Sequence, residues 1–242
     1  MAAAVERRFT QVTVEVRAGA VDRRTVGGYA AKFNQRSKNL GGFIEMVTPP
    51  FFNRDRGNGW GEVICRYNHN DDMLLGTIAG RTLRLSIDET GLLYEADLPQ
   101  SRADVFELIQ RGDVAKSSFA FRLYPDGDEW GLSPDEGYPM RKLVSGQLVD
   151  VAPVNIPAYS DSSVGTREHV GQAETAVALR SLAAKCEADV DEVVAAAVQD
   201  ELRRFLTVTG SDAPMPKPKP RTFGAAAMVA LLEKKTDPWG EQ

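Results

Sequence analysis

The chain has 242 residues, of which 43% are hydrophobic and 26% charged, as is ordinary for a protein that buries a core. Its formal net charge of −5 lacks the basic surplus expected for binding nucleic acid or an anionic membrane. Because no run of about 18 apolar residues occurs and residues 1–10 lack a secretory apolar stretch, neither a membrane span nor secretion is predicted. The two cysteines, Cys65 and Cys186, are far apart in the chain, which fits a reducing cytoplasm.

The first two thirds of the chain predict short strands and one helix. Alternating or continuous apolar residues between turn signals predict strands at 9–18, 24–34, 62–69, 82–89, 91–99, 115–125 and 146–157, with a strand and loop near 40–52. A helix is predicted where apolar residues have helical spacing, beginning near Ser101 and ending near Gly112. The acidic, turn-rich segment 126–140 is interpreted as a surface hairpin or loop. This pattern favours an α+β, β-rich fold, with a mostly antiparallel barrel or sandwich and attached helices.

The composition changes after Asp161. Residues 174–206 are rich in alanine and carry an apolar stripe at helical spacing, made of Leu182, Cys186, Val190, Val193, Ala197 and Phe205. This helix either packs on the strand domain or binds a partner protein, and the sequence leaves both open. Pro and Lys then alternate in an extended spacer at 213–220, and an apolar tail closes the chain. The predicted organisation is a domain over 8–165, a helical segment over 166–208 and a spacer with tail over 209–242.

His69 is one of two histidines and lies at the end of a predicted strand, in RYNHND. A metal site is disfavoured because the other histidine, His169, lies in the linker and no paired-cysteine motif occurs, so neither metal nor cofactor is predicted. A Cys65–His69 nucleophile and base are disfavoured because four strand residues would separate them by about 13 Å. Cys65 is therefore interpreted as a small buried hydrophobe.

A serine nucleophile remains, because a histidine can act as the general base for a hydroxyl. In the strand KSSFAF, Ser117 shares a face with two phenylalanines, which is the natural core face. Ser118 therefore points to the other face, beside small Ala120, where a substrate could approach. Asp150 interrupts an apolar strand, and it either protects a sheet edge or orients His69. The residues alone leave these two roles for Asp150 open.

Four blocks together resemble the prohead maturation proteases of tailed bacteriophages. The blocks are GYAAKFNQRS…LGGFIEMVTPPFF, RYNHNDDMLLGTIAGRTLRLSIDETGLLYEADLP, LIQRGDVAKSSFAFRL and LVDVAPVNIPAYSDSSV. The resemblance covers roughly residues 8–165 and depends on all four blocks occurring in order. It matches His69, Ser118 and Asp150 to the histidine, serine and acid of that family. Relatives often carry Asp directly after the histidine, whereas this chain has Asn70 and then Asp71, so either Asp71 or Asp150 could support the ring.

The resemblance implies a herpesvirus-protease-like fold, with a β-barrel of about seven strands and surrounding helices. It implies a serine endopeptidase, without a cofactor, that acts inside the immature phage capsid in the cytoplasm of the bacterial host, or is encoded by a prophage. The implied substrates are the scaffold or the scaffolding segment of the major capsid protein, and then other copies of the enzyme itself. The spacer at 213–220 is a candidate zone for this self-cleavage, because exposed extended segments are readily cut.

Two other functions remain as alternatives. One is a non-catalytic capsid-assembly or scaffold protein that keeps the protease fold. The other is an unrelated esterase, which is disfavoured because no serine lies in a G-x-S-x-G turn.

Overall fold

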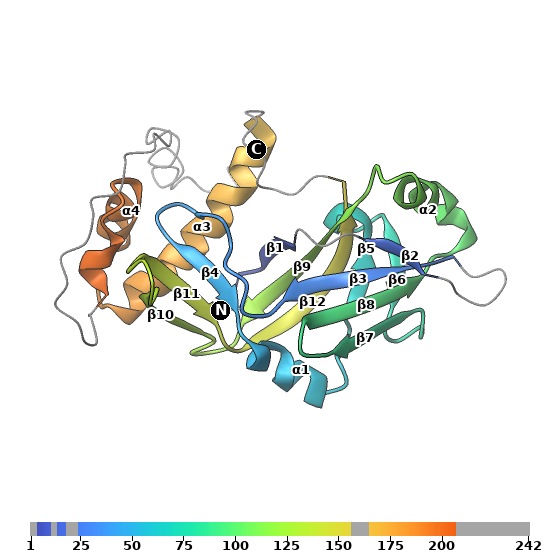
Figure 1. The fold of residues 1–242 in the computed structure, drawn as a ribbon, viewed down its shortest axis with the longest axis horizontal. Helices are drawn as coiled ribbons and strands as arrows, with labels where there is room; N and C mark the ends of the chain where they lie inside the picture. The colour runs from blue at the N-terminus through green and yellow to red at the C-terminus, as the bar shows by residue number, and fades with distance from the viewer. Residues whose placement is uncertain (1–3, 11–13, 18–23, 156–164, 207–242) are drawn as a thin grey trace, which may run out of the picture.

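The computed structural model describes residues 4–10, 14–17, 24–155 and 165–206, which form a mixed α+β fold rich in strands (Figure 1). The strands of these residues form three sheets, and none of the three is closed. The α+β, β-rich class is confirmed, but the β-barrel of about seven strands implied by the family resemblance is wrong for the described residues, which build three open sheets instead. Sheet closure depends on pairing between distant strands, and local residue patterns carry no signal for it.

The first sheet has five strands in the order β1-β9-β12-β5-β6. Their bounds are β1 (Glu6–Thr10), β9 (Lys116–Leu123), β12 (Gly146–Val154), β5 (Ile64–Arg66) and β6 (Leu74–Thr77). Only the β12–β5 pair of this sheet is parallel, and the other three pairs are antiparallel. The register of β12 against β9 shifts between Leu148 and Asp150, which marks a β-bulge.

The second sheet has the order β2-β3-β8-β7 and the third has the order β10-β11-β4. Their bounds are β2 (Glu15–Arg17), β3 (Thr25–Lys32), β8 (Gly91–Asp97), β7 (Leu83–Ile87), β10 (Asp128–Leu132), β11 (Pro139–Leu143) and β4 (Ile44–Val47). The segment 126–140, interpreted from its turn residues as a hairpin or loop, supplies β10 and the start of β11, which pair as an antiparallel hairpin. The predicted strand at 9–18 is divided between β1 and β2, which lie in different sheets.

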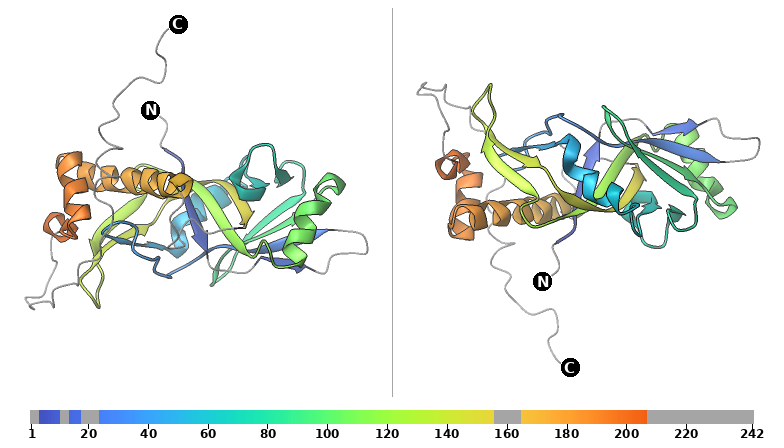
Figure 2. Two further views of the ribbon diagram at one scale, coloured as in Figure 1. Left: turned by 90° about the horizontal axis from the view of Figure 1, so that it is seen from above. Right: turned by 90° about the horizontal axis from the view of Figure 1, so that it is seen from below.

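Helices lie at both ends of the described fold, with α2 at one end and α3 and α4 at the other (Figures 1 and 2). The α-helices are α1 (Asn53–Gly57), α2 (Ala103–Gln110), α3 (Gly165–Lys185) and α4 (Val190–Val198), and the 3-10 helices are η1 (Pro49–Phe52), η2 (Tyr67–His69), η3 (Gln100–Arg102) and η4 (Leu202–Phe205). The helix expected over 174–206 is broken after Lys185, where Glu187 has a φ of 51°. Asp189 then caps α4 by accepting the N–H groups of Asp191 and Glu192.

Two apolar cores hold these layers together. The first lies between the first and second sheets and includes Phe51, Phe52, Phe119, Phe121, Leu92, Tyr94 and Val151. The second lies under α3 and α4 and contains three members of the predicted apolar stripe, Leu182, Val193 and Ala197. The stripe of this helical segment is therefore used for packing within the chain.

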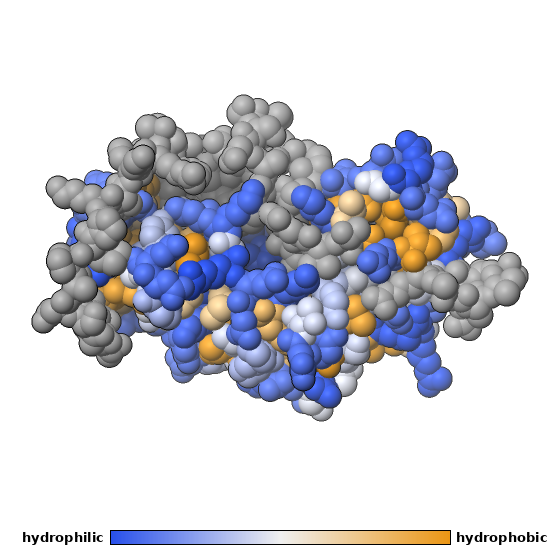
Figure 3. Space-filling view, viewed as in Figure 1, coloured by the Kyte–Doolittle hydropathy of each residue, from blue (hydrophilic) through white to orange (hydrophobic). Residues whose placement is uncertain are grey.

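No helix in the described part of the chain is long and apolar enough to cross a membrane. The coloured part of the face in Figure 3 is mostly hydrophilic, and apolar atoms gather near α2.

A buried network of charged side chains joins β1 to the third sheet. At its centre lies Arg141 of β11, which is 0% exposed. Its guanidinium donates to Glu6 at 2.6 Å, to Asp128 at 2.7 Å and to Glu45 at 3.0 Å. Arg8 of β1 contributes a second guanidinium, which donates to Glu45 at 2.5 and 2.8 Å. Each buried carboxylate named here therefore faces at least one cation, as burial of charge requires.

Glu174 of α3 connects this network to the helical segment through contacts with Arg7 and Arg8 of β1. Its Oε1 accepts the backbone N–H of Arg7 at 3.0 Å, and its Oε2 lies 3.7 Å from the Arg8 guanidinium. Burial raises the pKa of Glu174 to about 7, and the nearby Arg8 and Arg7 charges lower it only in part, with Glu6 opposing them. Glu174 therefore remains protonated in the folded protein at pH values where it is ionised in the unfolded chain.

This raised pKa predicts a stability that falls as pH rises. The unfolded chain releases the proton near pH 4.5 and the folded protein near 7, so the contribution is present below 4.5 and lost as pH passes 7. The whole shift corresponds to about 3 kcal/mol. We expect Glu174→Gln, a neutral isostere, to be more stable than the wild type at pH 8 and similar to it near pH 5, measured by urea unfolding. Parallel pH profiles for the two proteins would contradict the assignment.

Close backbone approaches explain particular glycines of the second sheet. A Cβ on Gly91 would lie 2.0 Å from the Ala31 carbonyl oxygen, and one on Gly27 would lie 2.4 Å from the Tyr94 carbonyl oxygen. Gly27 and Gly91 thus mark close approaches between the backbones of β3 and β8.

We expect Gly91→Ala to lower the free energy of unfolding by about 1–3 kcal/mol, because backbone atoms of β3 must move. The matched control is Gly131→Ala, where a Cβ meets nothing within 4 Å. Urea unfolding of the two variants measures the difference. Equal stabilities would show that β3 and β8 separate without cost.

Candidate active site

The alternation of β9 sends two adjacent serines to opposite faces of the first sheet. Ser117 lies 3.2 Å from the Tyr94 hydroxyl, inside the first core. Ser118 lies on the other face, where its Oγ is 2.6 Å from Nε2 of His69. Ser118 is 0% exposed, so the hydroxyl lies within the protein.

His69 reaches Ser118 from an unusual backbone turn after β5. Asn68 and His69 both have a positive φ, of 53° and 56°, a conformation that costs a non-glycine residue free energy. Asn is one of the residues that best tolerate this region, which gives Asn68 a conformational role. Its side-chain Oδ1 also accepts the N–H of Asn155 at 3.1 Å, just past β12. The turn that carries His69 is thus attached to the strand that carries Asp150.

Asp150 completes a chain of three side chains. Its Oδ1 lies 2.6 Å from Nδ1 of His69, and the carboxylate is 0% exposed. Asp150 comes directly after the β12 bulge, which sets its register against Ala120. A hydroxyl, an imidazole and a carboxylate in this order can pass a proton from the hydroxyl to the ring while the carboxylate holds the ring in place. The structure thus brings together Ser118, His69 and Asp150, which lie far apart in the sequence.

Arg66 is a further member of the site that the sequence did not indicate. It binds the second oxygen of Asp150 and also the carboxylate of Asp71. Burial alone would raise the pKa of Asp150, but His69 and Arg66 outweigh it and hold the pKa below its usual value. Asp71 itself is 88% exposed and is joined to Asp150 through Arg66. Of the two acids considered from the sequence, Asp150 is therefore the one that contacts His69 directly.

The Ser118 hydroxyl has a second acceptor, the backbone carbonyl of Arg8 in β1. The Ser118 Oγ lies 2.9 Å from this oxygen. A hydroxyl has one hydrogen, so the Arg8 carbonyl and Nε2 of His69 compete for it. Residue types do not indicate this contact, because every residue carries a backbone carbonyl.

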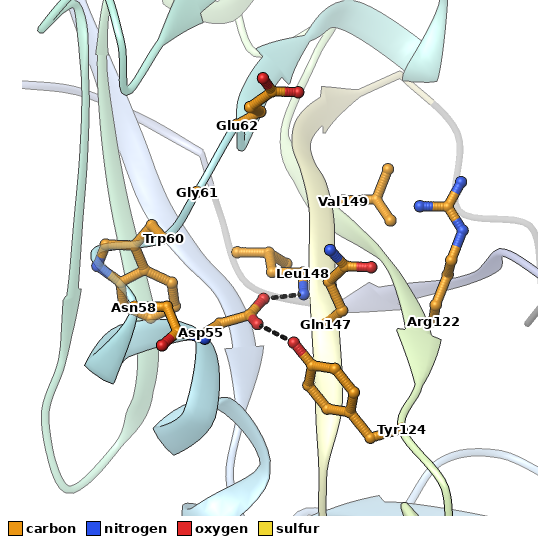
Figure 4. A pocket seen from close by; sticks show the side chains of 10 residues that line it. All are labelled: Asp55, Asn58, Trp60, Gly61, Glu62, Arg122, Tyr124, Gln147, Leu148 and Val149. Carbon is orange, nitrogen blue, oxygen red and sulfur yellow. Dashed lines mark hydrogen bonds between the residues drawn. The ribbon is translucent and has the colours of Figure 1, made fainter. Parts of the chain in front are cut away.

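A pocket of about 290 Å³ is lined in part by the β12 residues that precede Asp150, and none of Ser118, His69 and Asp150 lines it (Figure 4). It is lined by Asp55, Asn58, Trp60, Gly61, Glu62, Arg122, Tyr124, Gln147, Leu148 and Val149. Asp55 points from α1 to the β12 bulge, where it accepts the Leu148 N–H at 2.5 Å and the Tyr124 hydroxyl at 2.7 Å. Asp55 therefore holds the bulge that precedes Asp150.

Cys65 takes no part in this arrangement. Its thiol is fully buried in the first core. Burial first, and the nearby Asp150 charge second, raise the pKa of the thiol well above its usual value, which disfavours the reactive thiolate.

Of the comparisons with known proteins, one found a match, which is to a family of serine proteases. The model of the family described as caudovirus prohead serine protease matches residues 12–175, a span that includes Ser118, His69 and Asp150. Searches of curated proteins and of solved structures each found no match. Because the family match covers more than half of the chain, the chain belongs to the caudovirus prohead serine protease family.

Proposed function

We propose that the protein is a serine endopeptidase that cleaves the scaffold, or the scaffolding segment of the major capsid protein, within the immature capsid in the host cell. It then cleaves copies of itself. The observation that carries this proposal is the hydrogen-bonded chain Ser118–His69–Asp150, with both links at 2.6 Å. The family match supports the proposal, because it covers all three residues.

In the proposed acylation step, Ser118 Oγ attacks the carbonyl carbon of the scissile peptide bond. His69 Nε2 takes the hydroxyl proton as the new C–O bond forms, and the carbonyl becomes a tetrahedral oxyanion. The C–N bond then breaks, and the amine leaves with the proton from His69. The products of this step are an acyl-enzyme on Ser118 and the released amine end of the substrate.

In the proposed deacylation step, a water molecule takes the place of the amine. His69 accepts a proton from this water as it attacks the acyl carbonyl, and it returns the proton to Ser118 when the ester bond breaks. Asp150 accepts the Nδ1 hydrogen throughout, which fixes the ring tautomer and stabilises the imidazolium. Arg66 occupies the other oxygen of Asp150 and so positions the carboxylate.

Co-expression with the major capsid protein and scaffold of the same phage tests the proposal. We expect the wild type to convert precursor to shorter products, and Ser118→Ala to leave the precursor intact, as read by mass spectrometry. Uncut precursor with both proteins would favour the alternative of a non-catalytic assembly protein. Equal cutting by both would show that Ser118 is not the nucleophile. The self-cleavage zone considered at 213–220 lies outside the described residues, and the same spectra locate any cut there.

A further inference from the structure

The strand β1 pairs with one edge of β9, which is the strand that carries Ser118. β9 is bordered by β1 on one side and by β12 on the other. The register places Phe9 opposite Ser118 and Arg8 opposite Phe119, in an antiparallel pair. Any other extended peptide that pairs with this edge of β9 must therefore replace β1.

The backbone of β1 brings a peptide carbonyl within hydrogen-bond reach of the proposed nucleophile. The Arg8 carbonyl oxygen lies 2.9 Å from Ser118 Oγ, in a chain that is extended and paired with the nucleophile's own strand. Peptide recognition by strand addition to a sheet edge uses this same arrangement. β1 therefore lies where a peptide strand added to this edge of β9 would lie, and Arg8 is the residue whose carbonyl contacts Ser118.

The side chain of Arg8 contacts Glu6 of its own strand at 2.8 Å, and it also contacts side chains from the rest of the protein. It shares the face of Phe119, and its guanidinium lies 5.5 Å from the centre of the Phe121 ring. Glu45 binds it at 2.5 Å and Glu174 lies 3.7 Å away. These two acids belong to β4 and α3, so both remain in place when β1 leaves. The site is thus fitted to a guanidinium or ammonium group.

We infer that β1 occupies the substrate's place, and that the substrate is an extended segment with a basic residue on the acyl side of the cleaved bond. This inference rests on the proposed function, since it assigns a substrate class to the same Ser118. Such a segment replaces β1 on the edge of β9 and places its basic side chain against Glu45 and Glu174.

The bound β1 also restrains the proposed nucleophile. Attack requires the Ser118 hydrogen to move to Nε2 of His69, and the Arg8 carbonyl competes for that hydrogen. The occupied edge excludes a second strand as well. Substrate can then bind only those molecules in which β1 has left β9. The observed protease activity is therefore proportional to the fraction of molecules in this conformation.

Labelling of Ser118 by a fluorophosphonate probe tests this in the full chain, with Ser118→Ala as the blank. Arg8→Glu places a carboxylate against Glu45 and Glu174 and is expected to release β1. We expect it to react about tenfold faster than the wild type or more. Arg111→Glu, the same charge reversal at a side chain that is 61% exposed, should react like the wild type. Glu174→Ala, which removes the acceptor of the Arg7 N–H, is a milder second variant expected to react faster than the wild type.

A free peptide distinguishes release of β1 from the edge of β9 from a general loosening of the fold in the variants. The peptide AVERRFTQV, residues 4–12, should slow the labelling of Arg8→Glu, and the same peptide with Glu at position 8 should not. Equal labelling of the wild type and both variants, or equal effects of the two peptides, would overturn the inference while leaving the proposed nucleophile intact. Absence of labelling in every folded form would instead overturn the proposed function, and the inference with it. Thermal unfolding of each variant identifies the folded forms.

Discussion

Replacing His69 by alanine is expected to lower the rate of substrate cleavage by about 10⁴-fold or more. The Ser118 hydroxyl would lose its proton acceptor at 2.6 Å, and an alcohol without a base is a weak nucleophile. Ser118→Ala is expected to cost a similar factor. The double variant should lose little beyond either single variant, because the two residues act as one unit. Cleavage of a capsid-protein fragment, followed over time by mass spectrometry, measures all three.

Non-additivity is the decisive part of this experiment. If the losses of His69→Ala and Ser118→Ala multiplied in the double variant, the two residues would act separately and the proposed mechanism would be wrong. Ser117→Ala is the matched control, because Ser117 lies on the opposite face of the same strand with its Oγ near Tyr94. It should keep cleavage near the wild-type rate.

Replacing Arg141 by methionine is expected to lower the free energy of unfolding by about 3–5 kcal/mol. Methionine keeps much of the volume of the side chain but removes the charge, so Glu6, Glu45 and Asp128 lose a shared partner inside the protein. Three carboxylates that are at most 3% exposed cannot recover solvation by water. Urea unfolding monitored by circular dichroism measures the loss.

Arg36→Met is the matched control for this substitution. Arg36 also forms an ion pair, with Asp135, but its side chain is 38% exposed and that of Asp135 is 68% exposed. Exposed pairs contribute about 1 kcal/mol or less, so the control should unfold near the wild-type midpoint. Similar losses in both variants would mean that the buried network contributes no more than a surface pair.

The sequence predicted strands well where one face is apolar. β9 was visible because Phe119 and Phe121 alternate with small or polar residues, and the same alternation separated Ser117 from Ser118. The hairpin of β10 and β11 was one of two interpretations of segment 126–140, because its turn-forming residues fit a hairpin and a loop equally well. The arrangement in three open sheets was not predictable, because it depends on which distant strands pair.

The candidate site was predictable in its side chains and not in its backbone. His69, Ser118 and Asp150 were found from residue type and resemblance, and the structure places them in contact. Arg66 was missed because an arginine in a strand is usually a solvent-exposed residue, and nothing local marks its contact with Asp150. The positive φ of Asn68 and His69 had one weak indication in the sequence, the asparagine at position 68, because asparagine adopts this conformation more readily than most residues.

The strand order of the first sheet also sets the time at which the proposed activity can arise during synthesis. Ser118 is 110 residues from the Arg8 carbonyl that it binds, and His69 is 81 residues from Asp150. Contacts of such long range form slowly, and β12 must enter between β9 and β5 before they exist. β9 ends at Leu123 and β12 at Val154, so at about 5–20 residues per second a nascent chain spends roughly 2–6 seconds with β9 made and β12 incomplete. During that interval the growing chain has a serine and a histidine but no assembled site.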